Sequence, residues 1–377
     1  MSDPHDAQTP GPDIAPLAGY TVVVASDQRR HPVAGLLESV GARAVGIQAA
    51  RSVATPDEPV LREATTRLLA GGCDDLVVSS AVGLRAWVAT ARRWHMAQPL
   101  IAHFGAARLL ARDAAAADSL RALGLTGIFS TDGQTTEELL RFLAAQPLAG
   151  RRIVVETHRM SLTESCAVLR AGGAGVIEAP TYTAAPPAES YSPRRLCDLV
   201  IRRQVDALVL VGAPVAEQVV AHAEREGRLD SLATALNCDV LCVALGSQTA
   251  HPLAARGVQV RLAAGPYQEE VAEEVLRTLP LRGLQVAAGG HQLEVRGQAV
   301  VLDGQFIAVP GGPLAVLRAL ARQPGQVLSA AEIRGGEPAW ADVDDHAVEM
   351  AVSRLRNLLR GTDLVQTIVR RGYRLIT

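Results

Sequence analysis

The sequence contains no lysine, so arginine supplies all 37 of its basic residues. A phosphate-binding P-loop requires Gly-Lys-Ser/Thr, and Schiff-base catalysis requires a lysine amine. The sequence therefore excludes both of these chemistries. A phosphoacceptor receiver domain also normally uses a lysine, which argues against one in this chain.

Paired cysteines are lacking as well. The five cysteines include no Cys-x-x-Cys pair, and they are Cys73, Cys166, Cys197, Cys238 and Cys242. We therefore expect buried free thiols in a reducing cytosol. A redox pair formed by Cys238 and Cys242 is the alternative.

Export and membrane signals are also missing. Residues 1–16 have neither the basic start nor the apolar core of a signal peptide, and they predict a disordered tail. No apolar run is long enough to span a bilayer. We expect a cytoplasmic protein without membrane contact. Because the net charge is only −2, any basic patch that binds nucleic acid must be local.

Short apolar runs alternate with Ala/Leu-rich stretches between Leu17 and Leu279. The expected strands are Thr21–Ala25, Asp75–Ser79, Ile153–Glu156, Ala207–Val211 and Val240–Ala244. The expected helices are Pro32–Val40, Gly83–Arg93, Ser161–Ala171, Pro214–Glu226 and Thr249–Ala255. Strands separated by helices of this length predict an α/β fold with parallel sheets covered on both faces.

An internal repeat runs through this region at an offset of about 131 residues. Val22 corresponds to Ile153, and Asp75 corresponds to Asp206, each within a similar apolar run. A repeat of this size predicts two similar parallel-sheet lobes that face each other across a cleft.

The composition changes after Leu279. Residues 281–290 are expected to form a linker, within the Gly/Ala-rich stretch Pro280–Gly290. Short strands follow at Leu293–Val295, Ala299–Leu302 and Phe306–Val309, the last two joined by an Asp-Gly turn. Helical stretches and a closing strand pair complete the segment.

Residues Asp344–Arg360 predict an amphipathic helix. Its apolar residues Val348, Val352, Leu355 and Leu359 recur at i, i+4, i+7 and i+11 and should face a core. The opposite face carries Ser353, Arg354, Arg356, Asn357 and Arg360.

The end of the chain is locally basic. From Arg354 to Thr377 there are six arginines against Asp363 alone, a local charge of about +5. Guanidinium groups bind phosphates and read guanine edges through paired hydrogen bonds. A solvated arginine-rich helix in a partner-binding domain is the alternative.

The last 90 or so residues resemble the winged-helix DNA-binding domain of OmpR/PhoB-type regulators. The matching text is Ala351-Val-Ser-Arg-Leu-Arg-Asn-Leu-Leu and Gln366-Thr-Ile-Val-Arg-Arg-Gly-Tyr-Arg-Leu. The resemblance implies that Asp344–Arg360 enters the major groove of double-stranded DNA and that the wing Ile368–Gly372 lies near the minor groove. The implied DNA contacts are Ser353, Arg354, Arg356, Asn357, Arg360, Thr367, Arg370, Arg371 and Arg374. The wing departs from the family at Val369, where arginine is common.

The two-lobed region shows no metal-binding or catalytic motif, and we assign it no catalytic residue, metal or cofactor. Polar residues follow two expected strands, where loops line the cleft of an open α/β sheet. These anion-binding candidates, or alternatively plain exposed loop residues, are Gln28, Arg29, Arg30, His158 and Arg159.

The same region resembles uroporphyrinogen-III synthase, a two-lobed enzyme that cyclises hydroxymethylbilane. The matching text is Asp75-Leu-Val-Val-Ser-Ser-Ala-Val-Gly-Leu-Arg-Ala-Trp, Pro180-Thr-Tyr-Thr and Gly246-Ser-Gln-Thr-Ala. The resemblance implies one lobe from residues 17–50 and 185–280 and a second from 51–184, with the DNA-binding domain at 291–377. It implies a cleft with Ser79, Ser80, Tyr182, Gly212, Ser247 and Thr249.

Several cleft positions depart from that family. Val211-Gly212 lacks the second hydroxyl pair, Arg112-Asp-Ala-Ala lacks a threonine, and Ala25-Ser26 replaces an arginine. The leading hypothesis is therefore a transcription regulator whose synthase-like lobes sense a tetrapyrrole, another anionic small molecule or a partner regulator. Such fusions resemble actinobacterial regulators of nitrate and nitrite assimilation. The alternatives are an active synthase with an appended DNA-binding domain, and a protein-interaction scaffold.

Overall fold

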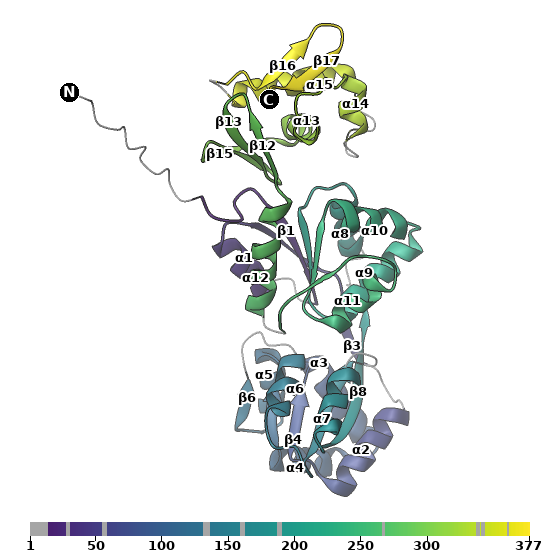
Figure 1. The fold of residues 1–377 in the computed structure, drawn as a ribbon. Helices are drawn as coiled ribbons and strands as arrows, with labels where there is room; N and C mark the ends of the chain where they lie inside the picture. The colour runs from purple at the N-terminus through teal and green to yellow at the C-terminus, as the bar shows by residue number, and fades with distance from the viewer. Residues whose placement is uncertain are drawn as a thin grey trace, which may run out of the picture.

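The computed structural model describes residues 14–27, 31–54, 59–130, 136–158, 163–186, 191–265, 268–336, 340, 344–359 and 362–377. These residues form three bodies stacked in a row (Figure 1). We call the middle body lobe one, the body at the bottom of Figure 1 lobe two, and the body at the top the C-terminal domain.

Lobe one is built on a parallel sheet with the strand order β11-β10-β9-β1-β2. Its strands are β1 (Thr21–Ser26), β2 (Arg43–Gln48), β9 (Ala207–Leu210), β10 (Leu241–Ala244) and β11 (Arg261–Leu262). Its helices are α1 (Pro32–Ser39), α8 (Tyr191–Ile201), α9 (Ala213–Arg225), α10 (Leu229–Cys238), α11 (Ser247–Ala254) and α12 (Gln268–Thr278). Every residue of β1 is buried, because α1 and α12 cover one face of the sheet and α8, α9 and α10 cover the other.

Lobe two has the strand order β3-β8-β7-β4-β5-β6, parallel except for β3. Its strands are β3 (Arg51–Ala54), β4 (Asp75–Val78), β5 (Arg108–Ala111), β6 (Ile128–Ser130), β7 (Arg152–His158) and β8 (Gly175–Ala185). Its helices are α2 (Pro59–Gly71), α3 (Ala81–Arg93), α4 (Ala97–Ala106), α5 (Ala114–Arg121), α6 (Thr136–Ala144) and α7 (Thr163–Ala171). The buried Trp87 packs edge-on against Phe104, with ring centroids 5.2 Å apart.

The two sheets repeat one topology. The order β8-β7-β4-β5-β6 in lobe two corresponds to β2-β1-β9-β10-β11 in lobe one, and Asp75 and Asp206 stand just before or at the start of equivalent strands. This confirms the α/β fold predicted from the repeat. The chain enters lobe two directly after β2 and returns to lobe one after β8, so lobe two is one continuous insertion.

Asp75 begins β4 and is fully buried. Its two carboxylate oxygens accept hydrogen bonds from Arg108 (Nε to Oδ1, 2.6 Å) and Arg151 (Nε to Oδ2, 2.9 Å). Both arginines belong to lobe two, so this end of the sheet is neutralised within the lobe.

The C-terminal domain combines a four-stranded antiparallel sheet, helices and a two-stranded wing. Its elements are η1 (Pro280–Arg282), β12 (Leu284–Ala288), β13 (His291–Val295), β14 (Ala299–Leu302), β15 (Gln305–Ala308), α13 (Gly311–Arg322), α14 (Ala330–Gly335), α15 (Asp345–Leu358), β16 (Val365–Ile368) and β17 (Gly372–Leu375).

The expected linker at 281–290 is wrong over most of its length, because residues 284–288 form β12 and pair with β13. Leu284, Val286 and Ala288 point toward the core of the domain in the alternating pattern of a strand. The two alanines that end the strand and the neighbouring glycines concealed this alternation in the sequence.

None of the helices in the described ranges combines the length and apolarity needed to cross a membrane. The five cysteines are free thiols, and Cys238 is exposed whereas the other four are buried.

We predict that Asp75→Asn lowers the free energy of unfolding by about 2 kcal/mol, because two arginines lose their buried anionic partner. The full penalty of a buried pair is reduced because Arg108 and Arg151 are 36% and 32% exposed. Thermal melting of the full chain measures the change. Asp118→Asn is the matched control, since its ion pair with Arg121 is exposed and worth little. Equal melting temperatures for the two variants would contradict the prediction.

Candidate ligand cleft and DNA-binding surface

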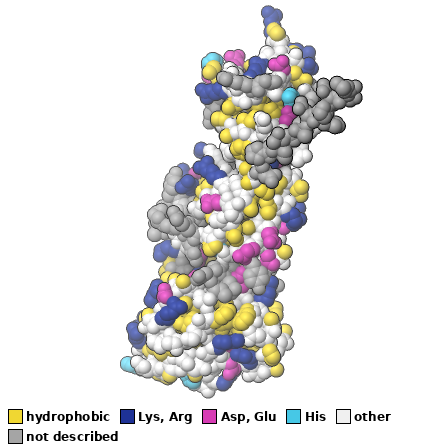
Figure 2. All heavy atoms as spheres, turned by 90° about the vertical axis from the view of Figure 1, so that its left-hand side faces the viewer, with side chains coloured by type: hydrophobic (Ala, Val, Ile, Leu, Met, Phe, Trp, Pro, Cys, Tyr) yellow, Lys and Arg dark blue, Asp and Glu magenta, His cyan; other side chains and the backbone are white. Residues whose placement is uncertain are grey.

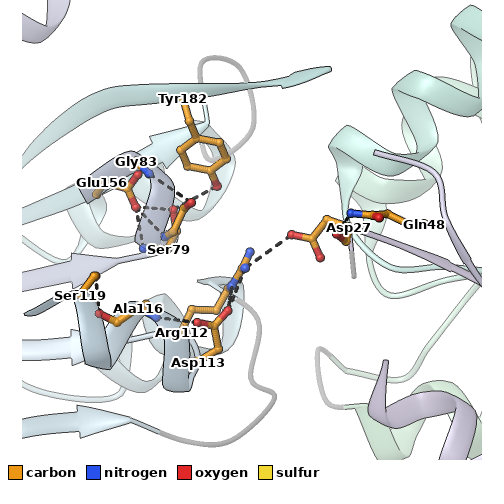
Figure 3. Close-up of polar contacts among 11 residues, drawn as sticks. Asp27, Gln48, Ser79, Gly83, Arg112, Asp113, Ala116, Ser119, Glu156 and Tyr182 are labelled. Atoms are coloured by element: carbon orange, nitrogen blue, oxygen red, sulfur yellow. Dashed lines mark hydrogen bonds and ion pairs between the residues drawn. The ribbon is translucent and has the colours of Figure 1, made fainter. Parts of the chain in front are cut away.

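A buried polar network lies at the end of lobe two that faces lobe one (Figure 3). Glu156, on β7, is fully buried, and its Oε2 accepts hydrogen bonds from the Ser79 amide (2.7 Å), the Ser79 hydroxyl (2.7 Å) and the Ser80 amide (2.9 Å). Its Oε1 accepts one from the hydroxyl of Thr181. The turn after β4 is thereby fixed to β7.

Tyr182 extends this network. Its hydroxyl lies 3.1 Å from the Ser79 hydroxyl, whose proton already points at Glu156. Burial, followed by the nearby Glu156, raises the pKa of Tyr182, so the phenol keeps its proton and donates it to Ser79. Burial also raises the pKa of Glu156, although the hydrogen bonds from Thr181, Ser79 and Ser80 oppose this effect.

Gly83, in the first turn of α3, is required by the same network. A Cβ at this position would lie 1.8 Å from Glu156 Oε1 and 2.3 Å from Thr181 Oγ1. Because both neighbours are held by hydrogen bonds, no other residue fits here without displacing the carboxylate.

An ion pair crosses from one lobe to the other. Arg112, after β5 in lobe two, places its Nη2 2.9 Å from Asp113 Oδ2 and 3.5 Å from Asp27 Oδ2, which follows β1 in lobe one (Figure 3). Burial alone would lower the pKa of Arg112, but Asp27, Tyr182 and Asp113 together raise it. The guanidinium is therefore a permanent positive charge between the lobes.

A second part of the cleft is a cavity of about 260 Å³ at the amino end of α11. Lobe one contributes residues 245–249, including Ser247 and Thr249, and lobe two contributes Arg141 from α6 and Ser165 from α7. Both lobes therefore contribute to the wall of this cavity, which carries hydroxyl groups and one arginine.

The structure separates the expected cleft residues into groups. Ser79, Ser80 and Tyr182 are buried and serve the network around Glu156, whereas Ser247 and Thr249 line the other cavity. Gly212, with φ of 100°, precedes α9 as its N-cap. Gln28, Arg29, Arg30 and Arg159 lie outside the described residues, as does the side chain of His158.

Sequence reasoning did not single out Glu156, Thr181 or Asp27, and of Arg112 it noted only that the segment beginning there lacks a threonine. A carboxylate at the end of a buried strand, in Arg152-Ile-Val-Val-Glu, was the available signal for Glu156, because such a group needs donors from elsewhere. The partners of Arg112 belong to distant segments and leave no local pattern.

The outer face of α15 carries the expected DNA contacts. Ser353, Arg354, Arg356 and Asn357 are exposed, while Val348, Ala351, Val352 and Leu355 are buried on the opposite face. Asp344 caps the helix by accepting a hydrogen bond from the Ala347 amide (2.9 Å). Arg360 lies outside the described residues.

Arg356 has a structural partner that the sequence did not reveal. Its Nε donates to the Val365 carbonyl (3.0 Å) and its Nη2 to the Thr367 hydroxyl (2.7 Å), which ties the helix to β16. Arg356 and Thr367 therefore hold the wing against α15.

The wing turn between β16 and β17 is exposed. Val369 is 79% exposed, Arg370 adopts a φ of 58°, and Arg371 is also exposed. Arg374, on β17, donates to Gln366 Oε1 (2.7 Å). In Figure 2 a dark blue side chain marks the tip of the C-terminal domain farthest from the lobes.

Solved structures resemble each part of the chain. A mutant uroporphyrinogen III synthase from the extremely thermophilic bacterium Thermus thermophilus is 24% identical, with a TM-score of 0.38, over 68% of this chain and 98% of that chain. The uroporphyrinogen-III synthetase from Helicobacter pylori 26695 is 13% identical, with a TM-score of 0.36, over 68% of this chain and 99% of that one. The DNA-binding domain of CpxR from E. coli is 28% identical, with a TM-score of 0.20, over 25% of this chain and 96% of that one.

A search of curated proteins found no match. Family models match two segments. Residues 304–375 match the C-terminal domain of transcriptional regulatory proteins. Residues 31–273, well over half of the chain, match uroporphyrinogen-III synthase HemD, so the chain belongs to that family.

Proposed function

We propose that the protein is a DNA-binding transcription regulator whose uroporphyrinogen-III synthase domain senses a ligand. One observation carries the proposal: exposed Ser353, Arg354 and Asn357 on α15 stand beside the exposed wing arginines Arg370 and Arg371, on a domain attached to the lobes. An exposed helix face beside a basic wing suits double-stranded DNA, with the helix in the major groove and the wing against the backbone.

Arg354 and Arg356 have different parts in this proposal. Arg354 is exposed on α15 and is available to a base edge or a phosphate. Arg356 is hydrogen-bonded to Val365 and Thr367, so it positions the wing.

We predict that Arg354→Ala weakens binding by about 1–3 kcal/mol and leaves the melting temperature unchanged. Arg356→Ala should weaken binding and also lower the melting temperature, because the wing loses two hydrogen bonds. Fluorescence anisotropy with a duplex selected by the full chain from a random pool measures the affinity across a series of salt concentrations.

Arg121→Ala is the control, because Arg121 lies on α5 in lobe two, in an exposed ion pair. The slope of log affinity against log salt should fall by about 1 for each lost phosphate contact. If Arg354→Ala and the control bind the selected duplex equally well, α15 is not the recognition helix.

For the lobes, we propose an anionic ligand of the tetrapyrrole polycarboxylate class. Two features of the cleft support this ligand class: Arg141 on the cavity wall, and the amino end of α11 with the positive end of its helix dipole. The cavity of about 260 Å³ is smaller than the usual pocket for a whole ligand, so it would receive one edge of a tetrapyrrole.

Arg141→Gln should weaken the binding of uroporphyrin III about tenfold, because a carboxylate loses a charged hydrogen-bond donor. Quenching of the porphyrin fluorescence measures this affinity. Arg121→Gln again serves as the control, and equal affinities for the two variants would exclude the cavity as the binding site.

An active synthase remains the second candidate, and the family match over residues 31–273 favours it. The cleft itself argues against catalysis. The hydroxyls of Ser79 and Thr181 donate hydrogen bonds to Glu156, and Gly212 offers no hydroxyl. We expect no sustained formation of uroporphyrinogen III from hydroxymethylbilane. Sustained turnover by the full chain would establish the enzyme instead.

We further propose that the controlled genes serve nitrate and nitrite assimilation. Two points support this target. Fusions of this kind resemble actinobacterial regulators of nitrate and nitrite assimilation, and siroheme, a tetrapyrrole, derives from the product of the synthase. A genome-wide profile of bound promoters decides the point, and a profile without such genes would remove this part of the proposal. A partner regulator acting through the lobes would appear as a co-purifying protein.

A further inference from the structure

The junction between lobe one and the C-terminal domain is built around Asp206. This residue immediately precedes β9 and corresponds to the buried Asp75 of lobe two. Asp75 is neutralised by Arg108 and Arg151, but the position equivalent to Arg151, 131 residues earlier, is Tyr20. Lobe one therefore lacks this internal cation.

The C-terminal domain brings a cation, Arg318, near Asp206. A Cβ at Gly297 would lie 1.8 Å from Asp206 Oδ2, so only glycine permits this approach, and Arg318 donates to the Gly297 carbonyl. Asp206 also accepts a hydrogen bond from the Thr21 amide (2.7 Å). Burial raises the pKa of Asp206 to about 6, although Thr21 and Arg318 oppose the shift.

A cavity of about 310 Å³ lies at this junction. Its walls include more positive than negative side chains, with two aspartates, Asp206 and Asp239, against five arginines. The arginines are Arg203, Arg282, Arg296, Arg318 and Arg322. Arg203 pairs with Asp239 (Nε to Oδ2, 2.9 Å), and Arg296 pairs with Glu294 (Nε to Oε1, 2.8 Å).

Two of these arginines keep donors for a ligand. Within the described residues, Arg282 donates one hydrogen bond, to the Cys238 carbonyl (3.3 Å), and Arg318 donates one, to Gly297. Each guanidinium has five N–H donors and no acceptor. One of the two arginines precedes β12 and the other lies on α13, so they approach the cavity from different elements.

Tyr20 adds an independent observation. Its side chain is only 3% exposed and lines the cavity, yet its hydroxyl has no hydrogen-bond partner among the described residues. Burial, followed by the nearby Glu294, raises the pKa of Tyr20 to about 12, so the hydroxyl keeps its proton. A buried donor without a partner destabilises the fold, and an acceptor in the cavity would relieve this cost.

We propose that this cavity binds a compact oxyanion with at least two negative charges, phosphate- or carboxylate-based. Its oxygens accept hydrogen bonds from Arg282, Arg318 and the Tyr20 hydroxyl. Tyr20 belongs to lobe one and Arg318 to the C-terminal domain, so the anion fastens one to the other. The site lies outside the cleft between the lobes, and its existence does not rest on the proposed regulatory function.

Isothermal titration of the full chain with inorganic pyrophosphate and, separately, with citrate tests the proposal in metal-free buffer. Sodium chloride at matched ionic strength is the blank. We expect saturable binding of at least one anion, weakened about tenfold by Arg282→Gln and also weakened by Tyr20→Phe. Binding of pyrophosphate alone or of citrate alone identifies the phosphate or the carboxylate source.

Arg202→Gln is the matched control, because Arg202 is exposed next to Arg203 and does not line the cavity. The expected affinity of this variant equals that of the unaltered chain. No saturable binding of either anion overturns the proposal, as does binding that Arg282→Gln and Tyr20→Phe leave unchanged. Because the titration contains no DNA, a failure to bind anions leaves the DNA-binding proposal intact. A failure to bind DNA likewise leaves the anion site intact.

Discussion

The close approach of Gly297 to the Asp206 carboxylate connects the two lobes to the C-terminal domain. Any side chain at position 297 would separate the two bodies, since even a single Cβ would overlap the carboxylate oxygens of Asp206. Arg296 reinforces the contact by donating to the carbonyl of Ala18 (3.0 Å), and Arg318 donates to the Gly297 carbonyl within the C-terminal domain.

The two lobes differ at the turns that face the cleft. In lobe two, Ser79 and Thr181 are committed to Glu156, and Gly83 leaves room for that carboxylate. In lobe one, the corresponding turn contains Gly212 without a hydroxyl. Between the lobes lie Arg112, which is paired with Asp27 and Asp113, and the amino end of α11.

The parallel sheets, the repeat and the buried face of α15 follow from the sequence, because each depends on local periodicity. Val348, Val352 and Leu355 are buried where their spacing requires it. The partners of Glu156 and Arg356 could not be predicted, since they depend on which distant segments meet. The strand β12 was missed for a different reason: it ends in two alanines and glycines adjoin it, so its alternation is weak.

The insertion of lobe two has a consequence for synthesis on the ribosome. Lobe two is a single uninterrupted segment from β3 to β8, so it can complete its sheet as soon as β8 has emerged. The sheet of lobe one must wait, because β1 acquires its second neighbour, β9, only after lobe two has been made. Since domains generally fold as units in order of emergence, the first strand to be translated completes its pairing only after all of lobe two has emerged.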